Sequence, residues 1–468
     1  MLTLPFTVGD AVRVTGGVLL SGDREKEITG ISLDSRQTKP GDLFVALRGE
    51  RVDGHSFVQD ALKKGATAAL IQQEVLIGEN TAVLQVDNCQ ETLLELAAWY
   101  RRRFNAAAVA ITGSTGKTTV KEMVAAVLTQ SFCVHKNKGN YNTEIGVPLT
   151  IFELRPEQDI AVLEMGMRGL GQIRRLAQVA APEIGVITNI GLTHLELLET
   201  VENIARAKGE LLEELPAAGI AILDGDDPRL RQLGRDFAGR VIFYGLGDGN
   251  DFRALNIRSH KEQGISFTVS TPQGAGEMVL PLPGRHNAVN ALAALAVGHC
   301  FGMALSDMAP GLKKMQPAAM RLDISKTPAG ITIINDAYNA NPTSMQSGLL
   351  TLMELKGPGR AVAVLGDMLE LGSAAAQAHR EVGGMAAELG VDLLLTIGTW
   401  KDEVLAGARE GDMSRENCRA WSNKEDLVAF LQEWLGPGDA VLVKASRGLQ
   451  LEDIAAELSR LGDDVSGG

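Results

Sequence analysis

The chain has 468 residues, of which 45% are hydrophobic and 22% are charged. This is an ordinary globular composition, and the length suffices for about three domains. The acidic surplus, a net charge of −13, argues against binding to nucleic acid or to an anionic membrane surface. The four cysteines are far apart, form no Cys-x-x-Cys pair and predict reduced, mostly buried thiols.

The chain start carries no signal-peptide pattern, and the longest apolar stretch, residues 288–305, is interrupted by polar residues. We therefore expect a cytoplasmic protein without membrane insertion. Residues 1–88 predict a small α/β domain with one helical segment at 56–64 and β-type runs at 28–33, 43–47, 68–71 and 83–86. A helical segment at 90–104 follows, and its basic run at 101–103 is interpreted as a solvated linker.

A central domain is predicted over residues 105–316, because apolar strands alternate there with amphipathic helices. The strands are expected at 108–112, 160–164, 184–189 and 221–224, and such repetition is typical of a mostly parallel sheet covered on both faces. An Ala-rich helix at 287–300 and a loop at 313–320 close this block.

A third domain, residues 321–463, repeats the alternation and predicts a smaller, Rossmann-like doubly wound fold. Its expected strands lie at 331–335, 361–365, 393–397 and 440–444, and its expected helices at 344–355, 374–389, 424–435 and 451–461. The fold class is thus α/β with three domains, the central one carrying a phosphate loop.

That phosphate loop is the strongest motif, Thr112-Gly-Ser-Thr-Gly-Lys-Thr-Thr119, placed between an apolar strand and a helix. Backbone amides and a helix N-terminus would face the anion, the lysine would add charge, and the first threonine would offer a hydroxyl to Mg²⁺. Ile111 replaces the outer glycine of the generic pattern, and a Gly-rich turn without ligand is the alternative. The predicted nucleotide-binding residues are Gly113, Ser114, Thr115, Gly116, Lys117, Thr118 and Thr119.

Three further residues are considered for metal binding or catalysis. Glu164 ends a predicted strand, where metal ligands of parallel sheets lie, although a charged residue that merely ends a strand is the alternative. His194 follows another strand, and a hydrogen-bonded structural histidine is the usual interpretation. Lys208 lies in a polar helix, where a lysine is usually a solvated surface residue without a role.

Polar loops complete the candidate site. Residues 136–148 are rich in amide side chains, and Asn137-Lys-Gly-Asn140 lacks the acidic residue that reads guanine, which favours adenine. In the third domain, polar loops at 336–342, 366–372 and 444–448 each follow a strand and predict a ligand crevice at one sheet edge. Ordinary connections remain the alternative for all of them.

Taken together, these segments resemble the ATP-dependent Mur ligases of peptidoglycan synthesis over essentially the whole chain. The resemblance is carried by Asp34-Ser-Arg36, Gly41-Asp-Leu-Phe-Val-Ala-Leu47, the phosphate loop, Asn140-Tyr-Asn-Thr-Glu-Ile-Gly-Val-Pro148, Ala207-Lys-Gly-Glu210, Gly284-Arg-His-Asn-Ala-Val-Asn290 and Asn335-Asp-Ala-Tyr-Asn-Ala-Asn-Pro342. The last motif resembles that of the member which adds D-alanyl-D-alanine to UDP-N-acetylmuramoyl-tripeptide.

The resemblance implies that the first domain holds the UDP-sugar, the central domain binds ATP, and the third brings the dipeptide. The resemblance implies that Thr118 and Glu164 are ligands of one Mg²⁺ and that His194 is a ligand of a second Mg²⁺. It also implies that Lys208 is a carbamate that supports the second Mg²⁺. Lys117, His194 and Lys208 become the catalytic candidates. A lysine carbamate is chemically plausible because only the neutral amine captures CO₂, which turns it into an anion.

The same resemblance assigns binding roles. It makes Asn287, Asn290, Arg321 and Asp336 further ATP contacts, and the substrate contacts Asp34, Ser35, Arg36, Asn140, Asn142, Thr143, Asn339, Asn341, Ser446 and Arg447. Some relatives carry a lysine two residues after the position of Asp336, whereas this chain has Tyr338.

The expected enzyme is therefore a monomeric acid–amino-acid ligase that phosphorylates a carboxylate to an acyl phosphate and transfers it to an amine. Its partners are the two small-molecule substrates. Two alternatives stay open at this point. One is a folyl-polyglutamate synthase, which should lack the first domain. The other is a phosphate-loop ATPase or regulatory module that makes no bond.

Overall fold

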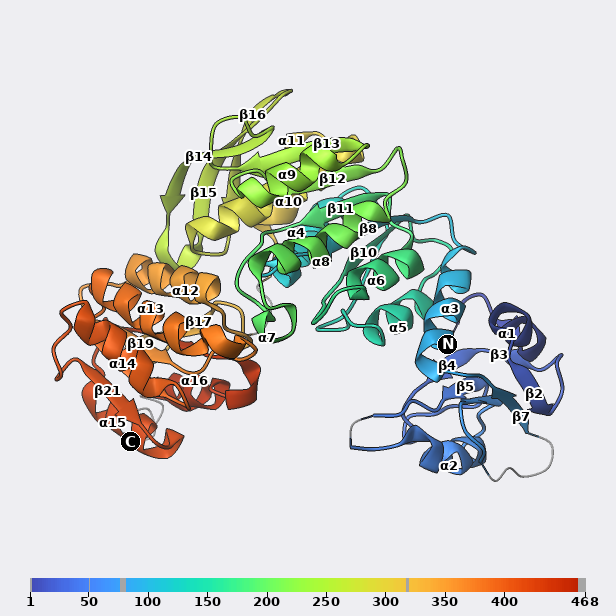
Figure 1. Ribbon diagram of the computed structural model, residues 1–468. Helices are drawn as coiled ribbons and strands as arrows, with labels where there is room; N and C mark the ends of the chain where they lie inside the picture. Colours follow the sequence, from blue (N-terminus) through green and yellow to red (C-terminus); the bar gives the residue numbers. More distant parts are fainter. Residues whose placement is uncertain (1, 50, 76–80, 317–319, 462–468) are drawn as a thin grey trace.

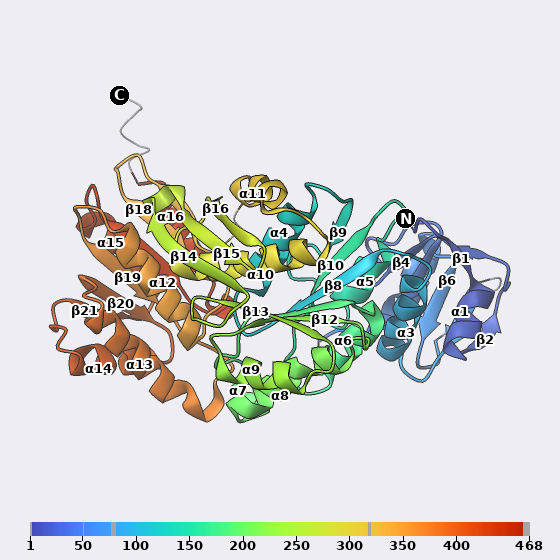
Figure 2. The ribbon, with the colours of Figure 1, turned by 90° about the horizontal axis from the view of Figure 1, so that it is seen from above.

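The computed structural model describes residues 2–49, 51–75, 81–316 and 320–461. Three α/β domains follow one another along the chain and form an arch, with the central domain between the other two (Figures 1 and 2). The predicted third-domain end, residue 463, and part of the predicted 313–320 loop lie outside the described residues. Within those residues, no helix is long and apolar enough to cross a membrane.

The first domain is built on a five-stranded sheet of order β2-β7-β6-β5-β4. Its strands are β2 (Val18–Ser21), β4 (Gly30–Ser32), β5 (Asp42–Val45), β6 (Ala68–Ile71) and β7 (Ala82–Gln85), and only β2 runs antiparallel to its neighbour. The predicted run at 28–33 is two strands, because β3 (Glu27–Ile28) pairs with β1 (Phe6–Thr7) before β4 joins β5. Helices α1 (Val8–Thr15), α2 (Val58–Lys63) and α3 (Cys89–Arg101) complete the domain.

Helix α3 connects the first domain to the central one, and Arg101 at its end is buried. Its guanidinium donates hydrogen bonds to the carbonyl oxygens of Ala180, Phe104 and Ala106 at 3.0, 3.2 and 2.6 Å. The interpretation of 101–103 as a solvated linker is therefore wrong for Arg101. Its guanidinium provides hydrogen-bond donors for three carbonyl groups where α3 meets the end of α6 (Gln172–Ala180).

The central domain has a nine-stranded sheet of order β16-β15-β14-β13-β12-β11-β8-β10-β9. Parallel pairing runs from β9 to β14 through β9 (Val134–Lys136), β10 (Ile160–Glu164), β8 (Ala107–Thr112), β11 (Ile184–Ile187), β12 (Ile220–Asp224), β13 (Arg240–Gly245) and β14 (Phe252–Ser259). The strands β15 (Ile265–Thr271) and β16 (Gly274–Leu280) add an antiparallel edge that the sequence did not predict. These edge strands bury only alternate residues, so they lack the continuous apolar runs of β8 and β10.

Helices cover both faces of this sheet. Alternate residues of β8 point to opposite sides, so that Val109 and Ile111 lie in one core and Ala110 in the other. The first core is closed by α4 (Lys117–Leu128), α10 (Arg285–Cys300) and α11 (Leu305–Lys313), and the second by α3, α5 (Gly146–Phe152), α6 and α8 (Val201–Glu213). Shorter helices α7 (Leu195–Leu198) and α9 (Pro228–Asp236) complete this domain. The predicted parallel, doubly covered sheet is confirmed.

The third domain contains a six-stranded sheet of order β17-β18-β22-β19-β20-β21. The strands are β17 (Asp323–Lys326), which is antiparallel to β18 (Thr332–Asn335), then β22 (Ala440–Lys444), β19 (Ala361–Leu365), β20 (Leu393–Ile397) and β21 (Cys418–Trp421). Helices α12 (Pro342–Leu355), α13 (Ala375–Glu388) and α14 (Lys401–Glu410) cover one face, and α15 (Lys424–Trp434) and α16 (Glu452–Ser459) the other. The doubly wound prediction is confirmed, although it missed β17, β21 and α14.

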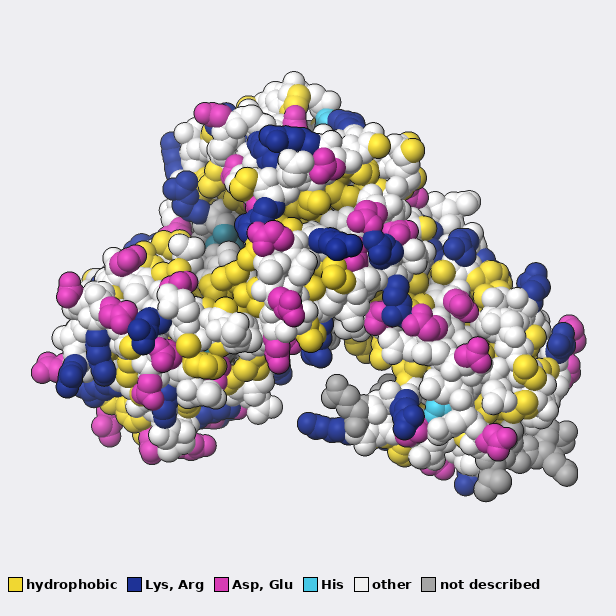
Figure 3. Space-filling model, in the orientation of Figure 1, with side chains coloured by type: hydrophobic (Ala, Val, Ile, Leu, Met, Phe, Trp, Pro, Cys, Tyr) yellow, Lys and Arg dark blue, Asp and Glu magenta, His cyan; other side chains and the backbone are white. Residues whose placement is uncertain are grey.

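The cysteines follow the prediction only in part. Cys89 and Cys418 are buried and Cys300 is half-buried, but Cys133 is exposed, so the expectation of a buried thiol is wrong there. On the face shown in Figure 3, acidic and basic side chains are mixed rather than gathered into one basic patch.

Helices α13 and α14 pack so closely that two glycines are required between them. A Cβ atom on Gly383 would lie 1.9 Å from the carbonyl oxygen of Val404, and one on Gly407 would lie 1.8 Å from that of Arg380. A Cβ on Gly384 would be 3.8 Å from its nearest neighbour. We predict that Gly383→Ala lowers the free energy of unfolding by about 1–3 kcal/mol, because the helices must move apart.

Gly384→Ala is the matched control in the same helix. It should leave stability unchanged or raise it by up to about 1 kcal/mol, since alanine favours helix and meets no close atom. Urea unfolding followed by tryptophan fluorescence measures both, because three of the four tryptophans, Trp400, Trp421 and Trp434, lie in the third domain. Equal stability of the two variants would contradict this account of the packing.

Candidate functional site

The phosphate loop follows β8 at the carboxyl edge of the central sheet and leads into α4 at Lys117. Gly113 and Gly116 have φ angles of 146° and 78°, which L-residues with side chains rarely adopt. A Cβ on Gly113 would lie 1.9 Å from the Thr188 hydroxyl oxygen. The loop therefore needs glycine at both positions, and it presents the free amides of the α4 N-terminus to an anion.

Residues after β11 hold this loop from the side. Asn189 accepts a hydrogen bond from the Thr115 amide at 2.9 Å and donates one to the Thr115 carbonyl at 3.1 Å. The Thr188 hydroxyl donates to the same carbonyl at 2.6 Å. The Ser114 hydroxyl donates to the Gly191 carbonyl and accepts from its amide. Sequence reasoning missed the roles of Thr188 and Asn189, because both lie within the predicted strand 184–189, whereas β11 ends at Ile187.

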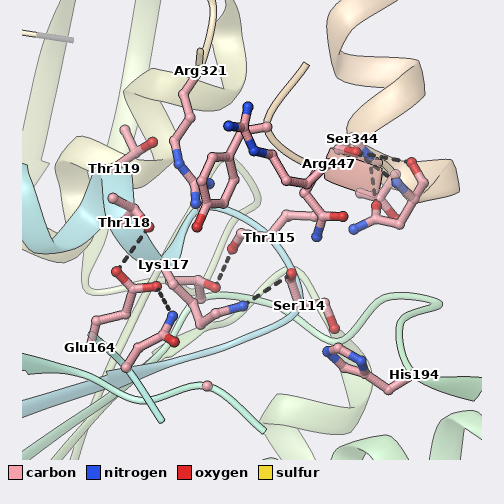
Figure 4. Close-up of a pocket in the computed structure, with 18 of the residues that line it drawn as sticks. Ser114, Thr115, Lys117, Thr118, Thr119, Glu164, His194, Arg321, Ser344 and Arg447 are labelled. Atoms are coloured by element: carbon pink, nitrogen blue, oxygen red, sulfur yellow. Dashed lines mark hydrogen bonds between the residues drawn. The ribbon is translucent and has the colours of Figure 1, made fainter. Parts of the chain in front are cut away.

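Lys117 lies in the cradle formed by its own loop. Its amine donates to the Gly113 carbonyl oxygen at 2.7 Å. It also lies 3.4 Å from the Ser114 carbonyl oxygen, a contact that Figure 4 shows. Burial lowers the pKa of Lys117 to about 8, and the positive charge of Arg321 acts in the same direction while Glu164 opposes it. An anionic ligand in the cradle would restore the preference for the charged amine.

Glu164, at the end of β10, is buried and connects the phosphate loop to the amide-rich segment. Its carboxylate accepts hydrogen bonds from the Thr118 hydroxyl at 2.8 Å and from the Asn142 side chain at 2.7 Å. The buried amine of Lys121 lies 3.6 Å from it and donates to the Asn137 carbonyl at 3.0 Å. Lys121 escaped sequence reasoning because it lies inside α4, one turn beyond the loop.

The pair Thr118 and Glu164 fits a divalent metal ion of the Mg²⁺ type. Its donors are a hydroxyl and a carboxylate oxygen 2.8 Å apart, which are hard ligands beside the place where phosphates would bind. In the part of the chain that the structure describes, no three His, Cys, Asp or Glu side chains converge to hold a metal.

Lys208 lies on the inner side of α8 and is 1% exposed. Among the described residues, none accepts a hydrogen bond from its amine. Burial holds the pKa of Lys208 well below its usual value, and the charge of Lys117 adds to the effect. The interpretation as a solvated surface lysine is therefore wrong, because packing of α8 against the sheet buries it. The neutral amine is the form that reacts with CO₂.

His194 lies at the start of α7 with a φ of 56° and contacts the third domain. Its Nδ1 is 2.5 Å from a carboxylate oxygen of Glu370, which follows β19, and Arg168 lies 3.6 Å from the other carboxylate oxygen. The hydrogen bond to His194 lowers the pKa of Glu370. This contact joins the central and third domains beside the phosphate loop. Among the residues that the structure describes, none forms a hydrogen bond with the His194 Nε2.

The loops after β18, β22 and β19 lie next to one another, as predicted, because these strands are neighbours in the sheet. Lys444, at the end of β22, is buried and pairs with the Asp336 carboxylate at 2.5 Å while it donates to the Asn339 carbonyl at 3.0 Å. Asn341 caps α12 by accepting from the Ser344 amide at 2.9 Å. Its side chain therefore also has a structural role.

At the start of α10, two predicted ATP contacts approach the phosphate loop. Asn290 donates to the side chain of Asn287 at 3.1 Å, and its Oδ1 would be 2.7 Å from a Cβ on Gly116. His286 lies in the same turn and faces the cavity. Burial lowers the pKa of His286 to about 4, so the ring is neutral near pH 7.

A cavity of about 1190 Å³ unites these groups and is lined by all three domains. Figure 4 shows the phosphate loop, Glu164 and His194 facing Arg321, Ser344 and Arg447 across it. The predicted site residues that line it are Ser114, Thr115, Gly116, Lys117, Thr118, Thr119, Asn142, Thr143, Glu164, His194, Asn287, Asn290, Arg321, Asp336, Asn339, Asn341, Ser446 and Arg447.

The remaining predicted site residues are not part of the cavity lining. They are Asp34, Ser35, Arg36, Gly113, Asn140 and Lys208. Asp34 and Arg36 pair with each other in the first domain, where the guanidinium holds the pKa of Asp34 far below its usual range. Instead, the first domain contributes Arg48 and Gly49 to the lining, which the sequence did not single out.

Comparisons with known proteins agree with this architecture. Residues 27–102 match the model of the Mur ligase family, catalytic domain, residues 111–298 that of the Mur ligase middle domain, and residues 320–447 that of the Mur ligase, glutamate ligase domain.

Full-length relatives and solved structures agree with these matches to the Mur ligase domain models. UDP-N-acetylmuramoyl-tripeptide--D-alanyl-D-alanine ligases of Bacillus subtilis and Escherichia coli are 38% and 36% identical, with 97–98% of this chain and 98–99% of theirs covered. The structure of MurF from Acinetobacter baumannii is 32% identical, with a TM-score of 0.90 over 98% of this chain and all of that one. MurF ligase of Thermotoga maritima in complex with ADP has a TM-score of 0.82 at 29% identity, over 92% and 97% of the two chains.

The fold and these matches define an ATP-dependent ligase with a phosphate loop at the junction of three domains. The chain belongs to the Mur ligase family.

The pKa of Lys117 predicts how nucleotide affinity depends on pH. Phosphate binding favours the charged amine, so affinity for ADP should be flat below pH 8 and fall as the free protein loses this proton. The dissociation constant should rise by up to about tenfold per pH unit above that point. Isothermal titration calorimetry between pH 7 and 9.5 measures it. The control Lys117→Met should bind weakly with little pH dependence, and an equal slope in both proteins would contradict the assignment.

Proposed function

We propose that this protein joins D-alanyl-D-alanine to UDP-N-acetylmuramoyl-tripeptide at the expense of ATP. The observation that carries the proposal is the single cavity in which the phosphate loop of the central domain faces polar loops of the third domain and Arg48 of the first. Three ligands of different chemistry could meet there. The names of the full-length relatives support these substrates.

The proposed reaction has two chemical steps. The terminal carboxylate of the tripeptide attacks the γ-phosphate of ATP, which gives an acyl phosphate and ADP. The dipeptide amine then attacks the acyl carbon, and the tetrahedral intermediate collapses to the amide and phosphate. No covalent enzyme nucleophile is required, so the protein acts by positioning and charge stabilisation.

Lys117 and the amides at the start of α4 would bind the ATP phosphates, and Ser114, Thr115 and Thr119 would complete the cradle. Asn287 and Asn290 are proposed on the adenine side, and Arg321 and Asp336 near the ribose and phosphates. The Asp336 carboxylate already pairs with Lys444, so it would contact the nucleotide and this lysine at the same time. Pre-formed donors cost no reorganisation when charge develops on the transferred group.

Mg²⁺ would neutralise negative charge on the phosphates when bound. Thr118 and Glu164 would hold one ion, and the geometry of their oxygen atoms supports this assignment. His194 and a carbamate of Lys208 would hold a second. The buried amine of Lys208, whose pKa is lowered and which has no acceptor among the described residues, supports the carbamate.

The positions of the other predicted substrate contacts in the structure support their roles less strongly. Asn142, Thr143, Asn339, Asn341, Ser446 and Arg447 line the cavity, whereas Asp34, Ser35, Arg36 and Asn140 do not. We keep the latter as contacts for the distant UDP end of the substrate, which extends beyond the reacting carboxylate. The cytoplasmic location, the monomeric state and the domain limits stay predictions.

The experiment that tests the proposal measures phosphate release and product mass with ATP, Mg²⁺ and UDP-N-acetylmuramoyl-tripeptide. D-Ala-D-Ala should give a product heavier by the dipeptide less one water, and single amino acids or glutamate should give far less. Product with glutamate and a folate would favour the folyl-polyglutamate alternative. Release without any amine would instead indicate a phosphate-loop ATPase.

Lys208 has its own test. Lys208→Ala should lose most ligation, by about 10²-fold or more, because a support of the second metal is removed. Short carboxylates added to this variant should restore part of the activity. The ¹³C NMR spectrum with ¹³CO₂ should show a carbamate signal in the wild type that Lys208→Ala lacks.

Lys121→Ala serves as the control in that spectrum, because Lys121 is also buried but donates to backbone carbonyls. The Lys208 carbamate signal should persist in the Lys121→Ala protein. Full activity of unrescued Lys208→Ala, or a carbamate signal that survives the substitution, would overturn this part of the proposal.

A further inference from the structure

The short segment 320–322, which precedes β17, has an unusual backbone. Met320 and Leu322 have φ angles of 57° and 51°, in the left-handed region that residues with side chains rarely adopt. Arg321 lies between them. Such conformations persist only where surrounding groups hold them, and they gather at ligand-binding and catalytic sites.

The loop after β18 provides the groups that hold this segment. The Leu322 amide donates to the Asp336 carboxylate at 3.2 Å, and the Tyr338 amide donates to the Met320 carbonyl at 3.3 Å. Asp336 is itself fixed by the buried amine of Lys444. Both left-handed residues are therefore tied to one anchored loop, and Arg321 projects from between them.

Tyr338 also contacts the Arg321 side chain directly. The guanidinium carbon lies 4.0 Å from the centre of the Tyr338 ring, a cation–π distance. Among the residues that the structure describes, none accepts a hydrogen bond from the Arg321 guanidinium, so its donors are available to a ligand. Figure 4 shows Arg321 and Lys117 facing the same space from opposite sides.

We propose that Tyr338 is a positioning residue whose ring holds the Arg321 guanidinium toward the phosphate loop, so that it binds the phosphate group that is transferred. The inference rests on the proposed function. It explains how the chain supplies a cation here although the tyrosine stands where some relatives carry a lysine. The positive charge comes from Arg321. Contact with the Tyr338 ring restricts the long Arg321 side chain to one orientation.

The test is a double-mutant cycle with Tyr338→Leu, Arg321→Ala and the combined variant. It is measured on the dissociation constant of a non-hydrolysable ATP analogue and on kcat for ligation. Tyr338→Leu should weaken analogue binding and lower kcat about tenfold, in the range of a well-placed cation–π contact. The same change should have almost no effect once Arg321 is alanine, because the two residues act as a unit.

Tyr338→Phe is the matched control, because it keeps the ring and loses only the hydroxyl. It should stay within about twofold of the wild type. Additive effects of the two substitutions, a Tyr338→Leu protein as active as the wild type, or a Tyr338→Phe protein as weak as Tyr338→Leu would each overturn the proposal. If Tyr338→Leu melts early, Tyr338→Met repeats the cycle with a more flexible side chain.

The two readouts separate this inference from the proposed function. Absence of dipeptide ligation by the wild type would overturn the function. Analogue binding would still show whether Tyr338 and Arg321 are coupled.

Discussion

The site depends on the hydrogen bond between the Thr118 hydroxyl and the Glu164 carboxylate. Thr118 belongs to the first turn of α4, and Glu164 ends the neighbouring strand β10. Glu164 is almost fully buried, and a buried carboxylate is stable only when it is well paired. Asn142 and Lys121 supply the remaining contacts, and through Asn142 the amide-rich segment is fixed beside the phosphate loop.

Basic side chains such as Lys117 and Arg321 line this cavity, together with acidic ones, in a protein that is acidic overall. Lys121 lies 3.6 Å from the Glu164 carboxylate, and the charges of Glu164 and Arg321 both act on Lys117. Burial lowers the pKa of Lys208, which avoids the cost of a buried charge. The phosphates of a nucleotide would pair with Lys117 and Arg321. The site is therefore suited to an anionic nucleotide because of charges that lie within one cavity, whereas the net charge of the chain would repel one.

The sequence predicted what local pattern determines and missed what distant packing determines. Buried parallel strands such as β8, β10 and β19 read as apolar runs, so they were found within a residue or two. The edge strands β15 and β16 alternate buried and exposed residues and were missed. The phosphate loop was found because Gly113 and Gly116 are required by backbone geometry that is local.

Other errors have the same cause. The local sequence predicts solvated side chains for Arg101 and Lys208, because nothing near them in the sequence shows that α6 and the sheet cover them. Asn189, Lys121 and Arg48 act through contacts between separate elements, which no spacing reveals. The roles given to Asp34, Ser35, Arg36 and Asn140 came from resemblance alone, and their positions outside the cavity lining leave those roles as predictions.

We propose that an acyl phosphate forms from the tripeptide carboxylate in this cavity. The most direct measurement uses UDP-N-acetylmuramoyl-tripeptide labelled with ¹⁸O in its terminal carboxylate, together with ATP, Mg²⁺ and D-Ala-D-Ala. One ¹⁸O atom per amide bond formed should appear in inorganic phosphate. Amide formation with no label in the phosphate would contradict this proposal, because the carboxylate oxygen would then never have been bonded to phosphorus.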